Sequence, residues 1–415
     1  MFSFLLYIHY FGVGNLLKRT AIFLLFTGLG LILSINIYAF TRENEPVSAL
    51  VMPEPSEAAL ARTETITLTA AGDCLMHNTQ IWSGLQEDGT YSFDHFFTEV
   101  KDLIEEGDYS SIDFEAAMAG PASGYTGYPT FNSPDAMADA LKNAGFDLVV
   151  TANNHVMDRG YKGALRTIEV LQNAGLDTLG VYKSEEDSKK FLIKDIRGVK
   201  VAYIAYTYGT NGIVVPQEHS CLVNMLDRDR ILSDIADVRP QVDILVLVLH
   251  WGVEYSPQAS EAQMKMAREF LEAGVDVILG SHPHVIQNME IIRVDDKDKL
   301  VIYSMGNFIG HQIGIERNSG IVLKMKFSKD FEQDETILDE VSYIPTFSHP
   351  YYINGKRQFR VVPVEETIEK ISEGEESILD SSDIPVLQTV LENTRKQLGN
   401  PFMNLNNQRD NKPEK

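Results

Sequence analysis

The chain has 415 residues, 44% of them hydrophobic and 23% charged, and its 36 basic and 59 acidic side chains give a formal net charge of −23. These values exclude a wholly disordered or fibrous chain, and so acidic a protein without a lysine- or arginine-rich cluster is not expected to bind nucleic acid. Its two cysteines, Cys74 and Cys221, are too few for a disulfide framework or a cysteine-based zinc site.

The first 63 residues form three segments of different composition. Residues 1–19 are mostly apolar, residues 20–40 carry no charge, and residues 41–63 are rich in Pro, Glu, Ala and Ser. As a helix the uncharged segment would be about 31 Å long, which matches a bilayer core. Lys18 and Arg19 precede it, so the positive-inside rule predicts a single-pass anchor in the cell membrane, with everything that follows it extracellular. Residues 1–19 would be cytoplasmic or interfacial, and residues 41–63 a flexible linker.

A cleaved signal peptide is the alternative interpretation of this N-terminal region. Cleavage requires small residues at the −3 and −1 positions, and Ile37-Tyr38-Ala39 offers only one. The apolar run is also longer than a usual signal-peptide core. We therefore favour the uncleaved anchor.

Between residues 64 and 364, short β-branched runs alternate with helical stretches, which predicts one layered α/β domain with a largely parallel sheet. The expected buried strands are Ile66–Ala71, Ser110–Phe114, Asp147–Thr151, Val201–Tyr206, Asp243–Leu249, Val275–Leu279 and Leu300–Tyr303. The expected helices are Asp94–Glu106, Pro134–Ala144, Tyr161–Ala174 and Ala259–Ala273. Added antiparallel strands are expected at Ile321–Phe327, Ile337–Tyr343 and Gln358–Val364.

One joint between a helix and a strand recurs three times. It is Ala144-Gly145-Phe146-Asp147, Ala174-Gly175-Leu176-Asp177 and Ala273-Gly274-Val275-Asp276. Each predicts a helix end, a left-handed glycine cap and entry into a strand. Residues 365–415 form an acidic and then Asn-rich tail, in which Ile384–Leu398 could be one amphipathic helix and the last fifteen residues are expected to be disordered.

Polar residues that can bind a metal follow five of the expected strands. They are Asp73, Glu115, the run Asn153-Asn154-His155, His250 and the run His282-Pro283-His284. In open α/β sheets, ligands bind beyond the carboxyl ends of the strands. Carboxylates, an amide oxygen and imidazoles together suit a pair of Zn, Mn or Fe ions, which would polarise a phosphoryl group and activate water. The pattern therefore indicates hydrolysis of a phosphate ester.

Each of these residues also has a structural interpretation. Asp73 can be a turn residue, Asn153-Asn154-His155 a turn before the Tyr161 helix, and His250 a hydrogen-bonded core histidine. Cys74 is expected to pack in the core. A serine hydrolase is disfavoured because no G-x-S-x-G elbow accompanies Ser281 or Ser304.

Five motifs occur in order along the chain: Ala71-Gly72-Asp73, Ala152-Asn153-Asn154-His155 with Asp158 and Gly160, His250-Trp251-Gly252-Val253-Glu254-Tyr255, Gly280-Ser281-His282-Pro283-His284-Val285 and Tyr303-Ser304-Met305-Gly306-Asn307-Phe308. Together they resemble the CapA family of poly-γ-glutamate capsule biosynthesis proteins, which lies in the calcineurin-like metallophosphatase superfamily. The resemblance implies a four-layer α-β-β-α sandwich with two divalent metal ions.

The resemblance also implies roles for the residues at the matching positions. Asp73 and His284 would hold one ion, while Asn154, His250 and His282 would hold the other, with Glu115 as the bridging carboxylate. His155 would be the general acid that protonates the leaving group, oriented by Asp158. Candidate substrate contacts are His77, Glu254 and Asn307.

Two positions depart from the family pattern. Phosphatases of the superfamily have Asp-x-His in the first motif, whereas Leu75 stands here at the histidine position, so His77 could substitute or the first ion could be weakly held. CapA proteins have Asn-Leu-Glu in the second motif, whereas this chain has Asp113-Phe114-Glu115. Asp113 could add a ligand or simply pack.

The resemblance implies a metal-dependent phosphoesterase that acts at the membrane with capsule polymer synthase components, on an anionic polymer or a phosphoester. The alternatives are a non-catalytic assembly factor of the synthase complex and a phosphoesterase for lipid-linked or cell-wall intermediates. Residues 64–364 carry 26 basic and 44 acidic side chains, or −18 of the −23 charge. A domain with this negative charge should repel a polyanion at long range. Brief contact at the ions, or a role in assembly, therefore fits the charge better than tight binding of the polymer does.

Overall fold

The computed structural model describes residues 62–406. The expected membrane anchor at 20–40, the segment 1–19 and the linker up to residue 61 lie outside this range, as do the last nine residues. Within the described range, none of the helices combines the length and the apolar character that a membrane crossing requires.

The first of two sheets has a parallel half and an antiparallel half. Its main strands run in the order β14-β13-β12-β1-β2-β3-β4. The parallel strands are β1 (Thr63–Cys74), β2 (Tyr109–Phe114), β3 (Leu148–Val150) and β4 (Asp177–Leu179). The antiparallel strands are β12 (Ser319–Asp330), β13 (Glu335–Ile353) and β14 (Lys356–Pro363), which confirms the expected late antiparallel strands. Two short strands, β11 (Asn307–Ile309) and β15 (Phe402–Asn404), pair with β1 and β13.

The second sheet has six strands in the order β5-β6-β7-β8-β10-β9. Its parallel centre consists of β6 (Val199–Thr207), β7 (Ile244–His250), β8 (Val277–Ser281) and β10 (Lys297–Ile302). The antiparallel edges are β5 (Leu192–Ile196) and β9 (Met289–Val294). The central strands are buried on both faces, which explains their continuous apolar sequence.

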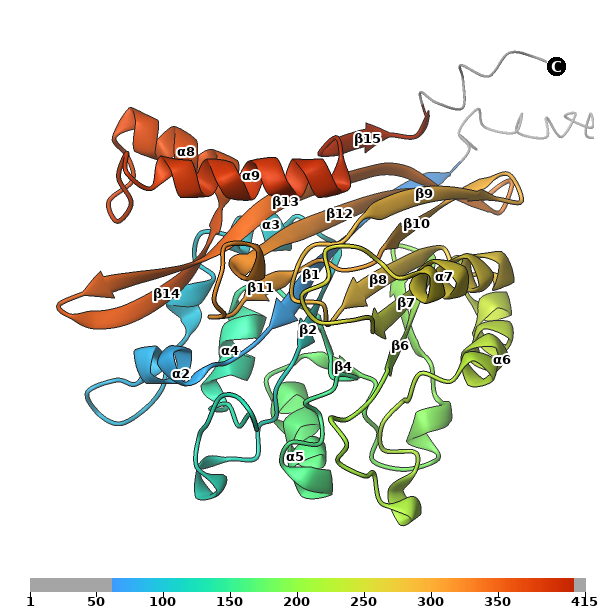
Figure 1. The fold of residues 1–415 in the computed structure, drawn as a ribbon. Coiled ribbons are helices and arrows are strands. Elements are labelled where there is room, and N and C mark those ends of the chain that lie inside the picture. Colours follow the sequence, from blue (N-terminus) through green and yellow to red (C-terminus); the bar gives the residue numbers. More distant parts are fainter. Residues whose placement is uncertain (1–61, 407–415) are drawn as a thin grey trace, which may run out of the picture. The chain divides into compact units, whose positions relative to one another are not determined.

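The two sheets pack against each other, and helices cover their outer faces (Figure 1). One apolar cluster joins the sheets, with Leu68 of β1 and Tyr203 of β6 among its fully buried members. The helices on the first sheet are α2 (Asn78–Gly84), α3 (Lys101–Glu105), α4 (Ala136–Asn143) and α5 (Gly160–Asn173). Those on the second sheet are α6 (Arg228–Val238) and α7 (Glu261–Ala273). The α-β-β-α sandwich implied by the resemblance is confirmed. The expected largely parallel sheet is wrong, because the domain has two sheets and each combines parallel with antiparallel strands.

The expected helix Asp94–Glu106 is wrong as a continuous element. A 3-10 turn, η1 (Asp94–Phe96), is followed by the separate helix α3. Phe93, Phe96 and Phe97 are all buried, and the chain here makes i to i+3 hydrogen bonds that direct the three rings into the core. The three glycine joints are confirmed, because Gly145, Gly175 and Gly274 have φ of +101°, +84° and +126°.

The segment after residue 364 folds back on the first sheet. It forms α8 (Val364–Glu373), α9 (Ile384–Leu398) and β15, and α9 has the bounds expected from its amphipathic pattern. Leu387 and Val390 of α9 pack with Phe347 and Val362 of the sheet. The acidic segment is thus packed on the domain as far as residue 406. The expected disorder of the last fifteen residues is wrong for residues 401–406, because Phe402–Asn404 form β15 and pair with β13.

Candidate metal centre

Six candidate ligands converge where strand ends of the two sheets meet. Asp73 lies near the end of β1, Glu115 directly follows β2, and Asn154 follows β3 of the same sheet. The second sheet supplies His250 at the end of β7, with His282 and His284 after β8. All six side chains are at most 3% exposed. The convergence of strand ends expected from the sequence is therefore present.

Glu115 is at the centre of this cluster. Its carboxylate oxygens lie within 4.8 Å of the ligand atoms of His282 and His284, and also of those of Asp73 and His250. Among the residues that the structure describes, neither of its oxygens has a hydrogen-bond partner, although the side chain is fully buried. Burial, together with the neighbouring Asp73 and Asp113, raises the pKa of Glu115 well above its usual range. A buried carboxylate without a hydrogen-bond partner, shared by two sets of potential ligands, fits a position that binds divalent metal.

The histidines are held in a form that suits metal binding. Burial lowers the pKa of His250 to about 3, and burial with the neighbouring imidazoles lowers that of His282 to about 2. Neutral imidazoles are the form that coordinates a metal. Within residues 62–406 the Nδ1 atom of His282 has no hydrogen-bond partner. His282 and His284 both have positive φ, +97° and +58°, so the loop adopts a conformation that directs both rings into the cluster at some cost in strain.

Asp113 packs behind His250. Its Oδ2 lies 2.8 Å from Nδ1 of His250, and Asn153 donates from Nδ2 to its Oδ1 at 3.2 Å. The other ring nitrogen of His250, Nε2, lies 3.0 Å from Oδ1 of Asn154. Asp113 therefore accepts a hydrogen from Nδ1, which leaves Nε2 without a hydrogen, so that its lone pair and Oδ1 of Asn154 can both face the centre.

We expect Asp113→Asn to lower the affinity of the protein for divalent metal by about 10- to 100-fold, because the ring of His250 loses its orienting carboxylate. Titration of Mn²⁺ or Zn²⁺ against a competing chelator measures this affinity. The exposed Asp229→Asn on α6 is the control and should bind as the wild type does. Unchanged affinity in Asp113→Asn would assign Asp113 to packing alone.

Asn307 and His284 are in direct contact. Nδ1 of His284 lies 3.0 Å from Oδ1 of Asn307 and 3.3 Å from Oδ2 of Asp73. Asn307 is fully buried in β11, where it pairs with Asp73 of β1. Its side chain therefore supports a candidate ligand, while the substrate contact expected for Asn307 stays a prediction.

The other two candidate substrate residues lie at the periphery. His77 caps the start of α2, outside both sets of candidate ligands in the described chain, and burial lowers its pKa to about 4. Its ring contacts Phe131, with centroids 5.7 Å apart. Leu75, at the position of the family histidine, is buried and apolar. Glu254 is exposed on the loop after His250.

His155 and Asp158 form a close pair beside the cluster. Nδ1 of His155 lies 2.7 Å from Oδ2 of Asp158, and its Nε2 lies 3.9 Å from Oε1 of Glu115. The backbone N–H of Phe131 donates to the same Asp158 oxygen at 2.6 Å, and the Phe131 ring stands edge-on to His155 with centroids 4.6 Å apart. The imidazole is thus oriented with Nε2 toward the candidate ligands.

Sequence reasoning missed two residues that follow β6. The ring of Tyr208 lies 4.5 Å from that of His282, and Nδ2 of Asn211 lies 3.4 Å from the ring nitrogens of His155. Asn154 donates to Oδ1 of Asn211 at 3.2 Å. Both residues follow a predicted parallel strand, so the strand-end rule applied to the other strands could have found them.

Comparison with known proteins gives one family and several relatives. Residues 67–312 match the model of the family described as bacterial capsule synthesis protein PGA_cap. The chain is 30% identical over 260 residues to the capsule biosynthesis protein CapA of Bacillus anthracis, over 60% of this chain and 61% of that protein. It is 27% identical over 226 residues to the PGA biosynthesis protein CapA of Bacillus subtilis, over 53% and 57%. The matches thus span about three fifths of these relatives' length.

A solved structure with a similar chain path is a putative 5′-nucleotidase from Staphylococcus aureus in complex with alpha-ketoglutarate. The TM-score is 0.44 at 14% sequence identity, over 79% of this chain and 58% of that one.

Proposed function

This chain belongs to the family of bacterial capsule synthesis proteins, and on that basis we propose that it is a metal-dependent phosphoesterase acting in the biosynthesis, release or anchoring of an anionic capsule polymer, poly-γ-glutamate. The observation that supports catalysis is the buried Glu115 carboxylate, which lacks a hydrogen-bond partner in the described chain and is shared by two sets of candidate ligands. Burying a carboxylate without a hydrogen-bond partner costs free energy, and bound divalent metal would offset that cost.

Six side chains would hold two divalent ions, Mn, Zn or Fe. They are Asp73, Glu115, Asn154, His250, His282 and His284. Bound divalent metal would polarise a phosphoryl oxygen and lower the pKa of a bound water.

The remaining chemistry belongs to His155. Asp158 accepts the hydrogen on Nδ1, so Nε2 is the ring atom that faces a substrate. When both ring nitrogens carry a proton, Nε2 can give its proton to the leaving oxygen, and the ring keeps the hydrogen on Nδ1. Asp158 is itself fixed by the backbone N–H of Phe131, and the ring of Phe131 closes one side of the imidazole from water. Asn211 lies close enough to contact the same ring.

We further propose that the domain is extracellular and is anchored to the cell membrane by residues 20–40, beside the synthase that makes the polymer. The uncharged segment with Lys18 and Arg19 before it supports this orientation. The net charge of −18 on residues 64–364 supports brief rather than tight contact with a polyanion.

The direct test is metal content of the purified protein, followed by turnover of a generic phosphodiester with and without chelator. Bound metal and turnover that chelator abolishes would support the proposal. A metal-free protein, or turnover that chelator leaves unchanged, would reject it.

We expect His155→Ala to lower kcat for an ester with a poor leaving group by about 10²- to 10⁴-fold while metal content stays at the wild-type level, because the general acid is lost but the candidate ligands remain. An ester of an activated leaving group such as p-nitrophenol needs little protonation, so the decrease in kcat for this ester should be much smaller. His219→Ala, outside the site, is the control. An equal loss for both esters would contradict the role of His155 as a proton donor.

The alternative is a non-catalytic assembly factor of the synthase complex, which the strong negative charge also favours. Polymer production in a strain lacking the protein distinguishes the two. If His155→Ala restores production fully, the scaffold function holds and the catalytic proposal fails.

A further inference from the structure

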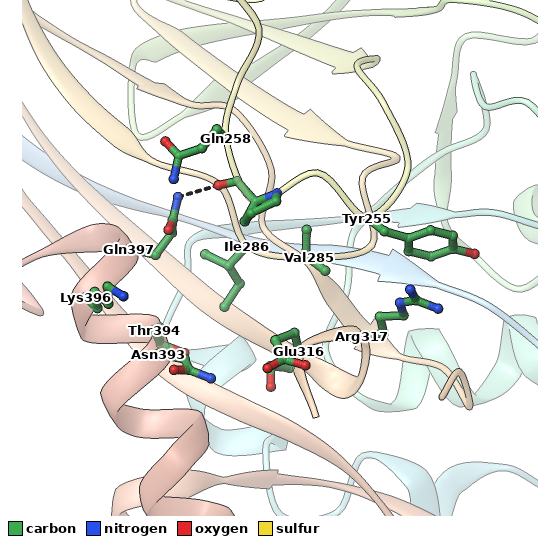
Figure 2. A pocket seen from close by; sticks show the side chains of 12 residues that line it. Tyr255, Gln258, Val285, Ile286, Glu316, Arg317, Asn393, Thr394, Lys396 and Gln397 are labelled. Carbon is green, nitrogen blue, oxygen red and sulfur yellow. Dashed lines mark hydrogen bonds between the residues drawn. The ribbon is translucent and has the colours of Figure 1, made fainter. Parts of the chain in front are cut away.

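A cavity of about 460 Å³ lies between the loop after β7, the 3-10 turn η6 (Glu316–Asn318) and the C-terminal end of α9. Figure 2 shows Val285 and Ile286 in its middle, with Tyr255 and Arg317 on one side and Lys396 and Gln397 on the other. Gln397 donates from Nε2 to the backbone oxygen of Pro257 at 2.7 Å, so α9 is tied to the loop that carries Tyr255.

The cavity is connected to the candidate metal centre through Tyr255 and Arg317. The ring of Tyr255 lies 5.9 Å from that of His284, and the guanidinium of Arg317 stacks over Tyr255 at 3.7 Å from the ring centroid. The backbone oxygen of Arg317 accepts a hydrogen bond from Nδ2 of Asn307 at 2.6 Å, and Asn307 contacts His284. Arg317 is therefore positioned by the same residue that orients a candidate ligand.

Arg317 and Lys396 are the cationic residues of the cavity lining, against one acid, Glu316. Over residues 62–406 neither of the two forms an ion pair, whereas Arg395 next along α9 is paired with Glu365. In a domain of strongly negative charge, a cationic cavity beside the centre gives an anion a local site that the overall field would otherwise disfavour. Stacking on Tyr255 restricts the guanidinium and leaves its hydrogen-bond donors available.

The lining also offers chemistry other than charge. Val285 and Ile286 provide apolar contact, while Gln258 and Asn393 provide amide groups that can donate and accept. Cation, amide and apolar groups together suit a chain with carboxylates, amide links and short methylene spacers. A planar guanidinium pairs with a planar carboxylate through two parallel hydrogen bonds, a geometry that a halide cannot provide.

We propose that this cavity is a binding subsite for the carboxylate-bearing, amide-linked part of the substrate, and that Arg317 is the residue that holds a carboxylate there. This inference rests on the proposed function for its substrate class, since it takes the polymer to extend from the metal centre into the cavity. Arg317 and the α9 residues lie beyond residue 312, where the match to the family model ends. The subsite therefore combines residues inside that match, such as Tyr255 and Val285, with residues that lie outside it.

The test is binding of penta-γ-glutamate to the metal-loaded protein by calorimetry. Arg317→Ala is expected to weaken binding by about 10- to 100-fold, because one charge-assisted, bidentate contact is lost. Arg317→Lys keeps the positive charge but lacks the planar guanidinium, so its affinity for the peptide should lie between those of the wild type and Arg317→Ala. Arg268→Ala, on an exposed part of α7, is the matched control and should bind as the wild type does. Lys396→Ala is a second variant at the cavity, expected to weaken binding by a smaller factor.

Inorganic phosphate is the second probe, because it can occupy the metal centre without entering the cavity. Phosphate affinity should change less in Arg317→Ala than peptide affinity does. Equal losses for both probes, or wild-type peptide binding in Arg317→Ala and Lys396→Ala, would overturn the subsite. If the protein shows no phosphodiester turnover but still binds the peptide in a way that depends on Arg317, the catalytic proposal is rejected and the subsite is retained. Failure of the catalytic proposal and failure of the subsite can thus be told apart.

Discussion

Replacing Glu115 with glutamine is expected to abolish metal-dependent turnover and, at the same time, to make the metal-free protein more stable. The glutamine is nearly isosteric but carries no charge to bridge two cations, so the loss of activity should reach the level seen with chelator. The opposite effect on stability follows from burial. Removing an unpaired carboxylate that stands beside Asp73 and Asp113 relieves both desolvation and like-charge repulsion, by about 1 to 3 kcal/mol.

The two effects of Glu115→Gln are measured separately. Metal content and phosphodiester turnover report the first, and denaturant unfolding with chelator present reports the second. Added Mn²⁺ or Zn²⁺ should raise the unfolding midpoint of the wild type but not that of the variant, since a ligand stabilises only the state that binds it. Glu272→Gln, an exposed change on α7, should alter neither property. Full metal content in Glu115→Gln would reject the bridging position of this carboxylate.

Replacing Arg360 with alanine is expected to lower the free energy of unfolding by about 3 to 5 kcal/mol, because two carboxylates in partly or fully buried positions lose their shared cation. Arg360 is 5% exposed on β14. Its guanidinium donates to Glu99 at 2.6 Å and to Glu376 at 3.0 Å. Glu376 lies between α8 and α9, so the same contact holds the C-terminal segment on the sheet.

The loss in Arg360→Ala should depend on pH. Burial raises the pKa of Glu376, but the contact with Arg360 and the backbone N–H groups of Ile378 and Leu379 outweigh it, so the pKa stays below the usual 4.5. A carboxyl with a lowered pKa stabilises the folded state above its unfolded pKa, and this contribution disappears as the pH falls through the folded value. Burial raises the pKa of Glu99, the other partner of Arg360, above 4.5, so Glu99 loses its charge first as the pH falls. The difference in unfolding free energy between wild type and variant should therefore begin to shrink above about pH 4.5 and shrink further below it.

Denaturant unfolding at neutral and at acidic pH measures the effect of Arg360→Ala. Arg357→Ala is the matched control on the same strand, since Arg357 contacts the exposed Tyr352 and should contribute less than about 1 kcal/mol. Arg360→Lys should recover part of the stability. A loss in Arg360→Ala no larger than in Arg357→Ala would show that the buried ion pairs are not what holds the segment.

Strand and helix positions could be predicted from the sequence because they follow from local periodicity. The buried strands β2 and β7 and the helix α7 lie within two residues of their expected ends, and α9 matches its expected bounds. The expected helix Asp94–Glu106 failed where three buried phenylalanines override the regular helical period. The helix α6 and the edge strands β5 and β9 were not among the expected elements. The candidate ligands could likewise be predicted, because a polar residue directly after an apolar strand can be recognised from a few consecutive residues of the sequence.

Only the tertiary structure decided how those residues meet. Asp113 and His250 are 137 positions apart, and the contact between them exists because two separate sheets pack face to face. No local pattern encodes that packing, so the roles of Asp113 and Asn307 behind the histidines could not be read from the chain. The same holds for the cavity between residues 255–258 and α9, which joins segments 140 positions apart. Periodicity and motif spacing therefore determined which side chains stand at strand ends, while non-local packing decided which of them touch and what lies beside them.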